Sequence, residues 1–258
     1  MKLAVLSDIH GNLVALEAVL TDVQSVGEVD MVWVLGDLAA FGPRPSECIK
    51  RIRTLQEERT KDKCKVIGGN TDRYLVTGER LKTRPAENED ALPGFLSEMQ
   101  ARDMRLNWNL SKLDWEDYDF LKGILGRETS LAVPGYGHVI GYHAVPGDDE
   151  SMALKPDSPA EEAADALLDR EGRMGIGGHT HLQMDRDLGR WRAINVGSVG
   201  FSSDMPGRAQ WGLFTFEADS VIVNLRAVPY DVEHLMADAN DAGYPDLENL
   251  KARVQADA

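Results

Sequence analysis

The sequence predicts an α/β fold with a mixed core of two sheets and a helical insertion. In the first third of the chain, short apolar runs at residues 3–6, 31–35 and 65–67 alternate with amphipathic helical patterns. This strand–helix–strand alternation is typical of a parallel sheet with helices on its faces. Apolar runs separated by short turns return after residue 128, which predicts a second group of strands.

Helices are expected where apolar residues recur at helical spacing. Residues 13–26 and 46–55 show this spacing between the first three predicted strands. A further helix is expected over residues 158–171, since Ser158, Pro159 and Glu161 have the pattern of a capped helix start. Later strands are expected at residues 129–133, 138–145, 174–176, 183–188, 191–196, 212–217 and 221–228.

A chain of 258 residues fits one domain, and we expect residues 1–258 to form a single one. Residues 74–128 interrupt the rhythm of strands and helices, because they are charged and have helical spacing. We interpret them as a helical insertion within the domain. Residues 230–258 are expected to form C-terminal helices.

The composition excludes some classes of function. A net charge of −15 is the opposite of the basic footprint of general nucleic-acid-binding proteins, so we expect no such binding. The two cysteines, Cys48 and Cys64, form no CxxC pair, which favours a reducing compartment. No apolar stretch approaches the ~20 residues of a membrane span. The sequence therefore predicts a cytoplasmic protein with no membrane partner.

Side chains that bind metals follow five successive predicted strands. In open α/β sheets, ligands bind at the carboxyl ends of the strands, so functional residues are expected there. Four of the six histidines of the chain lie in these segments, whereas His138 and His234 are interpreted as structural or surface residues. The candidate ligands are Asp8, His10, Asp37, Asn70, His143, His179 and His181.

These residue types suit divalent transition metals. Imidazole, carboxylate and amide oxygen bind Mn, Fe, Zn, Ni or Co. The i, i+2 spacing of Asp8 with His10, and of His179 with His181, would point both side chains the same way on an extended segment. Each motif alone has an ordinary explanation as a turn or a core histidine. Their occurrence together, in one order on one fold, predicts a metal site.

The motifs resemble those of the calcineurin-like metallophosphoesterase superfamily over nearly the whole chain. Within that superfamily, the sequence is most similar to the compact bacterial and archaeal branch of YfcE-like and Vps29-like phosphodiesterases. The turn at residues 195–200 resembles the N-P-G-S-V-G turn of this branch, with Val196 in the place of proline. The matching motifs are Asp8-Ile9-His10, Gly36-Asp37, Gly69-Asn70-Thr71-Asp72, His143 and Gly178-His179-Thr180-His181.

The resemblance implies a four-layered α/β/β/α sandwich that binds two divalent metal ions. Manganese is favoured, and Fe, Zn, Ni, Co or Mg would also suit the ligands. The resemblance assigns Asp8, His10 and His181 to one metal, Asn70, His143 and His179 to the other, and Asp37 to both. Asp37, Asn70 and Asp72 are the implied catalytic residues.

The implied activity is hydrolysis of a phosphate ester by a hydroxide that bridges the two metals. Many members of the superfamily have a histidine after the asparagine, which is thought to protonate the leaving oxygen. This sequence has Thr71 there, which favours substrates with good leaving groups or a proton supplied by water. Arg44 and Arg73 follow ligand-bearing strand ends and are candidates for binding the substrate phosphate.

Several functions remain open at this stage. The favoured one is a phosphodiesterase or phosphatase that acts on a small phosphorylated substrate. A non-catalytic scaffold of the Vps29-like kind is disfavoured because every ligand position is filled. A nuclease of the Mre11 kind is disfavoured by the length and the net charge. A nucleotide-polyphosphate hydrolase and a protein phosphatase of the same fold stay open, as does the oligomeric state.

Overall fold

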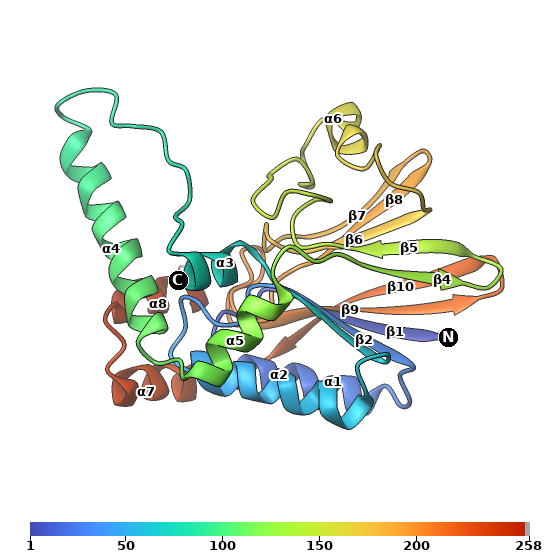
Figure 1. Ribbon diagram of the computed structural model, residues 1–258, viewed down its shortest axis with the longest axis horizontal. Helices are drawn as coiled ribbons and strands as arrows, with labels where there is room; N and C mark the ends of the chain where they lie inside the picture. The colour runs from blue at the N-terminus through green and yellow to red at the C-terminus, as the bar shows by residue number, and fades with distance from the viewer. Residues whose placement is uncertain (256–258) are drawn as a thin grey trace.

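The computed structural model describes residues 1–255, and its core is two five-stranded sheets packed face to face (Figure 1). The first sheet has the strand order β10-β9-β1-β2-β3. Its β1, β2 and β3 are parallel, and β9 runs antiparallel to both β1 and β10. The strands are β1 (Lys2–Leu6), β2 (Met31–Leu35), β3 (Cys64–Ile67), β9 (Arg208–Glu217) and β10 (Ser220–Pro229).

The second sheet has the order β4-β5-β6-β8-β7, and its three central strands are parallel. Both edge strands run antiparallel to their neighbours. The carboxyl ends of the parallel strands of both sheets lie at one edge of the core, because Asp8 follows β1 and its Oδ1 lies 3.9 Å from Nε2 of His143, which follows β5. The strands are β4 (Thr129–Val133), β5 (Gly137–Gly141), β6 (Met174–Gly177), β7 (Gln183–Leu188) and β8 (Trp191–Val196).

Helices cover the outer faces of both sheets, which confirms the predicted α/β/β/α layers. Helices α1 (Leu13–Ser25) and α2 (Pro45–Arg59) pack on the first sheet, and α6 (Ala160–Asp165) packs on the second. Figure 1 shows α1 and α2 side by side beneath the sheets. The other helices are α3 (Asn70–Thr77), α4 (Leu92–Leu110), α5 (Trp115–Ile124), α7 (Val232–Ala242) and α8 (Leu247–Val254).

Side chains alternate between the two faces of each central strand, as a strand requires. In β1, Leu3 and Val5 face the second sheet, whereas Ala4 and Leu6 pack toward the helices. In β2, the fully buried Trp33 lies between the sheets. Because both faces are covered, these strands are continuously apolar in sequence, which is why their positions could be predicted.

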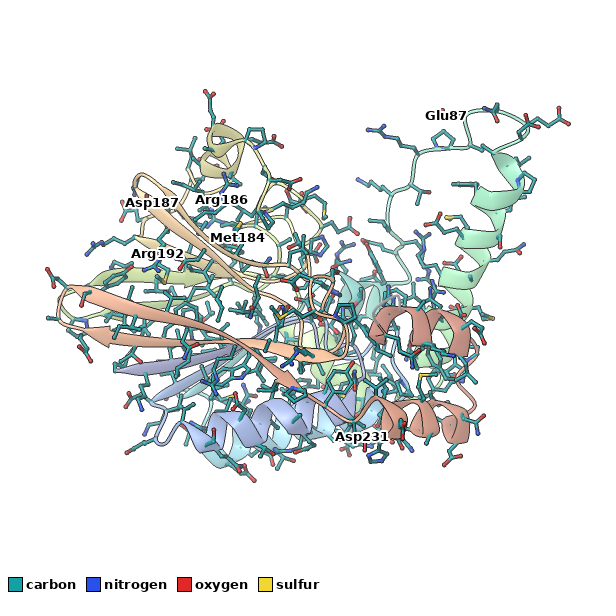
Figure 2. The ribbon with its side chains drawn as sticks, turned by 180° about the vertical axis from the view of Figure 1, so that it is seen from behind. Glu87, Met184, Arg186, Asp187, Arg192 and Asp231 are labelled. Atoms are coloured by element: carbon teal, nitrogen blue, oxygen red, sulfur yellow. The ribbon has the colours of Figure 1, made fainter. Side chains whose placement is uncertain are left out.

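The region of residues 74–128 contains α4, α5 and the end of α3, which starts earlier, at Asn70. Helix α4 extends away from the sheets, and Glu87 lies at the outer end of the segment that leads to it (Figure 2). Asp114 caps α5 by accepting the backbone N–H of Asp117. The division of the chain into a core and an insertion stays a prediction.

Two predicted elements differ from the structure. The helix expected over 158–171 spans only Ala160–Asp165 as α6, and the Ser158 hydroxyl accepts the N–H of Lys155 instead of capping the helix. The strand expected over 138–145 ends at Gly141, so His143 follows the strand rather than lying in it. The predicted C-terminal helices are present as α7 and α8, and residues 256–258 lie outside the described part.

Across residues 1–255, no helix is both long enough and apolar enough to cross a membrane. Cys48 and Cys64 are both buried and free. Burial raises the pKa of the Cys64 thiol to about 11, so this thiol is neutral at physiological pH.

Candidate metal centre

The predicted ligands meet at the carboxyl ends of the central strands. Three of them form a first group, in which Asp8 Oδ1 lies 3.3 Å from His181 Nε2 and 3.8 Å from His10 Nε2. The two Nε2 atoms lie 3.0 Å apart. Asp8 and His10 are buried, whereas His181 is 17% exposed, so the centre opens to solvent on the side of His181.

A second group shares Asp8 with the first. Asp37 Oδ2 lies 3.5 Å from His143 Nε2, and Asp8 Oδ1 lies 3.9 Å from the same nitrogen. Asn70 Oδ1 lies 3.1 Å from His143 Nε2 and 3.1 Å from His179 Nδ1. Asp37 Oδ2 also lies 3.6 Å from His10 Nε2, which places Asp37 between the two groups. All seven predicted ligands are thus brought together, and Asp8 is more central than expected.

The backbone at Asp8, His10, His179 and His181 is not extended. The prediction that their i, i+2 spacing aligns the side chains on an extended segment is therefore wrong. Within residues 1–255, eight non-glycine residues have positive φ, and five of them are candidate ligands. The chain turns sharply as it leaves each strand, and the ligands occupy left-handed conformations. Such conformations cost of order 1–3 kcal/mol each and cluster at functional sites. The five are Asp8, His10, Asp37, His179 and His181, with φ between 53° and 68°.

Three of the four histidines are oriented by backbone carbonyl groups. His10 Nδ1 contacts the oxygen of Ala40 at 3.0 Å, His143 Nδ1 that of Leu35 at 2.7 Å and His181 Nδ1 that of Phe201 at 2.7 Å. A carbonyl only accepts hydrogen bonds, so each Nδ1 carries the proton. In the neutral form of each imidazole, Nε2 then has a lone pair that faces the centre, as metal ligation requires.

Asp72 is the residue that fixes the position of Asp37. Its carboxylate accepts the backbone N–H groups of Asp37 at 2.8 Å, Leu38 at 2.9 Å and Gly69 at 3.0 Å. Asp72 is fully buried. Both of its oxygens are therefore engaged in holding the end of β2 against the start of α3.

Gly36 and Gly69 let these two segments approach closely. A Cβ on Gly36 would lie 2.5 Å from the nitrogen of Gly69, and Gly36 has a φ of +92°. A Cβ on Gly69 would lie 2.2 Å from Asp37 Oδ1. The oxygen Asp37 Oδ1 accepts the backbone N–H of Thr71 at 2.9 Å, which leaves Oδ2 toward the histidines.

Residues 1–219 match the family described as the calcineurin-like phosphoesterase superfamily domain. The chain belongs to the calcineurin-like phosphoesterase superfamily. All seven candidate ligands lie within the matched part, whereas α7 and α8 follow it.

Three similar proteins illustrate the range of this superfamily. Uncharacterized protein MJ0912 of Methanocaldococcus jannaschii is 42% identical over 249 residues, which cover 90% of this chain and 88% of that protein. A crystal structure of a metallophosphoesterase from Sphaerobacter thermophilus has a TM-score of 0.70 at 25% identity, with 98% of both chains covered. A symmetrical bis(5'-nucleosyl)-tetraphosphatase of Vibrio vulnificus is 34% identical over 95 residues, which cover 36% of this chain and 33% of that enzyme.

The turn predicted at residues 195–200 holds the first calcineurin-like motif in place. Ser198 Oγ donates to the carbonyl of Asp8 at 2.9 Å, and the N–H of Gly200 donates to the same oxygen at 2.8 Å. Asn195 Nδ2 donates to the carbonyl of Gly178, next to His179. Sequence reasoning found this turn only through the resemblance, because the Asp8 carbonyl that it holds lies 190 positions from Ser198.

Charges within the cluster control the ionisation of the ligands. Burial opposes ionisation of Asp8, but His181 and His143 outweigh it and hold the pKa of Asp8 at about 2. Burial lowers the pKa of His10 to about 4, despite the opposing effect of Asp37. The pKa of His143 is raised to about 10, because Asp37 and Asp8 outweigh its burial. A cation that binds here would therefore displace a proton from His143.

The donor set fits divalent metal ions. Asp8 Oδ1 is buried and has no hydrogen-bond partner within residues 1–255, although a carboxylate oxygen without a partner is costly in a protein interior. It lies among the Nε2 atoms of His10, His143 and His181. A cation at this position would satisfy the carboxylate and the imidazole lone pairs together. The superfamily and this arrangement both point to bound divalent metal.

The two predicted substrate-binding arginines are engaged elsewhere in the structure. Arg44 Nη2 pairs with Asp238 Oδ1 at 2.7 Å. Arg73 forms a two-pronged ion pair with Asp149, in which Nε and Nη2 donate at 3.0 Å and 2.7 Å. Arg73 lies beside the centre, because it lines a cavity together with His143. A substrate-binding role of either arginine stays a prediction.

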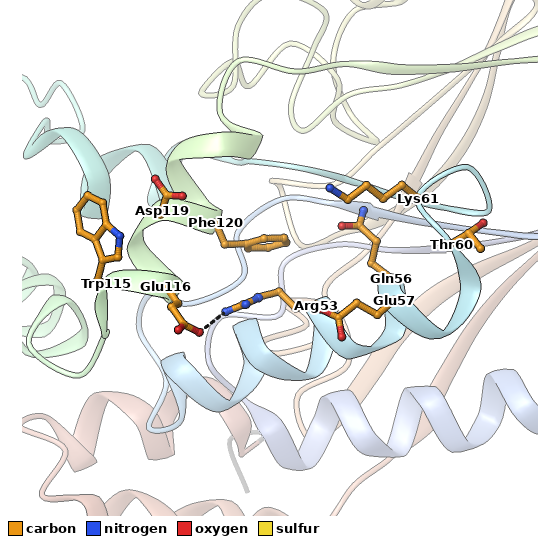
Figure 3. Close-up of a pocket in the computed structure, with 9 residues that line it drawn as sticks. All are labelled: Arg53, Gln56, Glu57, Thr60, Lys61, Trp115, Glu116, Asp119 and Phe120. Atoms are coloured by element: carbon orange, nitrogen blue, oxygen red, sulfur yellow. Dashed lines mark ion pairs between the residues drawn. The ribbon is translucent and has the colours of Figure 1, made fainter.

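Another cavity lies away from the metal centre, between α2 and α5 (Figure 3). It measures about 550 Å³ and contains none of the candidate ligands. Arg53 and Glu116 pair across it at 3.6 Å (Figure 3). The cavity beside His143 is smaller, at about 250 Å³, and it adjoins the candidate metal centre.

Proposed function

We propose that this protein is a binuclear metal-dependent phosphoesterase with a preference for phosphodiesters. The observation that carries the proposal is the unpartnered, buried oxygen of Asp8 among three inward-facing imidazoles. Asp37, with one oxygen fixed by Thr71 N–H and the other near His10 and His143, is the residue placed to serve both metals. Manganese is the favoured ion, and the cytoplasm is the proposed location.

When two divalent ions are bound, they supply an activated water and offset the charge that develops on the phosphoryl group. The residues of the chain supply the geometry. Asp8, Asp37 and Asn70 provide oxygens, and the carbonyl-oriented histidines provide nitrogens. Asp72 holds the Asp37 backbone from behind. Its proposed catalytic contribution is to position Asp37.

The preference for good leaving groups follows from Thr71. Its side chain is buried, and its hydroxyl has no hydrogen-bond partner within residues 1–255. A threonine hydroxyl does not ionise near neutral pH, so it cannot protonate a leaving alcohol. Rates should therefore depend steeply on the pKa of the leaving group.

The test is hydrolysis of bis-p-nitrophenyl phosphate and p-nitrophenyl phosphate by metal-stripped protein reloaded with Mn²⁺. Turnover that requires the metal and is lost in Asp37→Ala, with the diester preferred, is the expected result. Asp119→Asn is the matched control, because within residues 1–255 the exposed Asp119 of α5 forms an ion pair with Lys122 alone. Absence of turnover with Mn²⁺, Zn²⁺, Ni²⁺ and Co²⁺ in folded protein would overturn the proposal and favour a scaffold.

The similarity to symmetrical bis(5'-nucleosyl)-tetraphosphatases favours one second candidate, a hydrolase of nucleotide polyphosphates. That similarity covers 36% of this chain in the Vibrio vulnificus enzyme. Diadenosine tetraphosphate should be included as a substrate. A kcat/KM for it that exceeds the value for the p-nitrophenyl diester would make this second candidate the better one.

A further inference from the structure

A cavity of about 250 Å³ opens directly beside the metal centre. One wall is His143, whose Nε2 lies 3.5 Å from Asp37 Oδ2. The backbone of Gly68 and Gly147 forms other parts of the wall. The volume is below the roughly 300–1,000 Å³ of sites for drug-sized ligands. The cavity therefore has room for one small ester group of a substrate whose phosphate lies on the metals.

Acidic side chains dominate the charge around the cavity. Asp148, Asp149 and Glu128 line it, together with Arg73 and Arg127. Arg170 pairs with Glu128 at 2.8 Å. Two further carboxylates contact Arg73 from outside the cavity, those of Glu79 and Glu150. The five carboxylates exceed the three guanidinium groups by two negative charges.

Arg73 is already occupied by neighbouring carboxylates and does not offer its charge to a substrate. Its Nε and Nη2 are engaged by Asp149, its Nη1 is engaged by Glu79, and Glu150 Oε1 lies 3.2 Å from Nη2. Glu150 Oε1 is buried and makes no hydrogen bond within the described residues, so three carboxylates, those of Asp149, Glu79 and Glu150, face one guanidinium group. A second anionic group of a substrate could pair with Arg73 only by displacing Asp149, and it would still face the remaining carboxylates.

Carboxylates that repel anions are good acceptors for hydroxyl groups, and the Arg127 guanidinium offers donors. On the basis of the proposed phosphodiesterase activity, we propose that this cavity receives an uncharged, hydroxyl-rich alcohol of the substrate, such as a small polyol or a sugar. Asp149 and Glu150 then determine specificity by excluding alcohols that carry a further negative charge. Arg73 is a positioning residue that holds this acidic rim in place.

Two p-nitrophenyl phosphodiesters that share a leaving group test this inference. One carries glycerol as the second alcohol, and the other carries 3-hydroxypropionate, which is anionic. The expected result for the Mn²⁺-loaded protein is a kcat/KM about tenfold higher for the glycerol ester. Asp149→Asn should reduce that preference about tenfold, mainly through KM for the anionic ester. Glu150→Gln should also reduce the preference for the glycerol ester, and it leaves the residues that line the cavity unchanged.

Bis-p-nitrophenyl phosphate, assayed alongside, separates the two proposals. If neither it nor the paired esters are hydrolysed, the phosphodiesterase proposal fails. If it is hydrolysed, but the paired esters react equally and neither variant changes their ratio relative to Asp119→Asn, the specificity inference is overturned. Higher salt should also weaken the discrimination, because it screens partly exposed charges such as Asp149, which is 28% exposed. If the kcat/KM ratio of the two esters does not change with salt, the shape of the cavity rather than its charge selects the alcohol.

Discussion

The carboxylate of Asp72 accepts the backbone N–H of Asp37 across a distance of 2.8 Å and a separation of 35 residues. One buried side chain thereby joins the end of β2 to the start of α3, where Asn70 lies. The position of two candidate metal ligands, Asp37 and Asn70, depends on a residue that need not touch a metal. Such supporting residues commonly determine metal affinity as much as the ligands do.

Replacing Asp72 with asparagine should weaken metal binding about 10–100-fold. An amide offers one accepting oxygen and directs N–H toward backbone N–H groups, so at least one buried donor loses its partner. The free energy of unfolding should fall by about 1–3 kcal/mol. Calorimetric titration with Mn²⁺ and urea unfolding of the metal-free protein measure the two effects. Destabilisation with unchanged metal affinity would show that Asp72 supports the fold but not the centre.

Gly36→Ala should damage the centre, whereas Gly27→Ala should be tolerated. Both glycines have positive φ, so both substitutions add similar backbone strain of about 1 kcal/mol. Only at Gly36 would the new methyl group meet the backbone, 2.5 Å from the nitrogen of Gly69. Nothing lies within 4 Å of a Cβ at Gly27. The decisive measurement is Mn²⁺ affinity, and equal affinities in the two variants would contradict the argument from close approach.

Divalent metal should stabilise the protein against unfolding, and chelation should reverse this effect. A ligand that binds only the native state adds about 2.7 kcal/mol at a concentration 100 times its Kd. Thermal unfolding with increasing Mn²⁺ should therefore show a rising midpoint, with a much smaller rise in Asp37→Ala, whose cluster lacks Asp37 Oδ2. A similar rise in both proteins would place the stabilising metal at another site.

The ion pair between Asp22 and Arg226 should contribute pH-dependent stability. Arg226 donates Nε and Nη2 to the Asp22 carboxylate at 2.7 Å and 2.8 Å, and Trp211 Nε1 donates at 2.9 Å. The hydrogen bond from Arg226, with help from Trp211, lowers the pKa of Asp22 below its ordinary 3.8 despite partial burial. The lowered pKa means that this stability is present above about pH 4 and is lost as the pH falls through the folded-state pKa.

Asp22→Asn should accordingly cost about 1–2 kcal/mol at pH 7, as expected for a two-pronged, charged hydrogen-bonded pair. The difference in unfolding free energy from the unaltered protein should shrink as the pH falls below about 4. Urea unfolding from pH 7 to pH 3 measures it, with Asp119→Asn as an exposed-pair control expected to change stability by less than about 0.5 kcal/mol. A difference that stays constant down to pH 3 would indicate a loss unrelated to ionisation.

The sequence alone determined the layers of the fold and the set of candidate ligands. Leu3 to Leu6 and the β2 residues around Trp33 form apolar runs because both faces of these strands are buried, and a buried strand is a local pattern. The ligands could be predicted because the carboxyl ends of parallel strands meet at one edge, so residues such as Asp8 and Asp37 need only follow a strand. Both inferences require information from a few neighbouring residues.

Only the tertiary structure decided how those residues are used. The left-handed backbone at Asp8 and His179 depends on hydrogen bonds from other segments, such as the N–H of His179 to Asp8 Oδ2 at 2.8 Å. Arg73 looks free in the sequence, yet it is held by Asp149, which lies 76 residues further along the chain. The pattern of residues within a segment carries no information about a partner brought close by folding. For this reason the sequence could name the candidate ligands of the centre, but not the acidic rim that we propose selects its substrate.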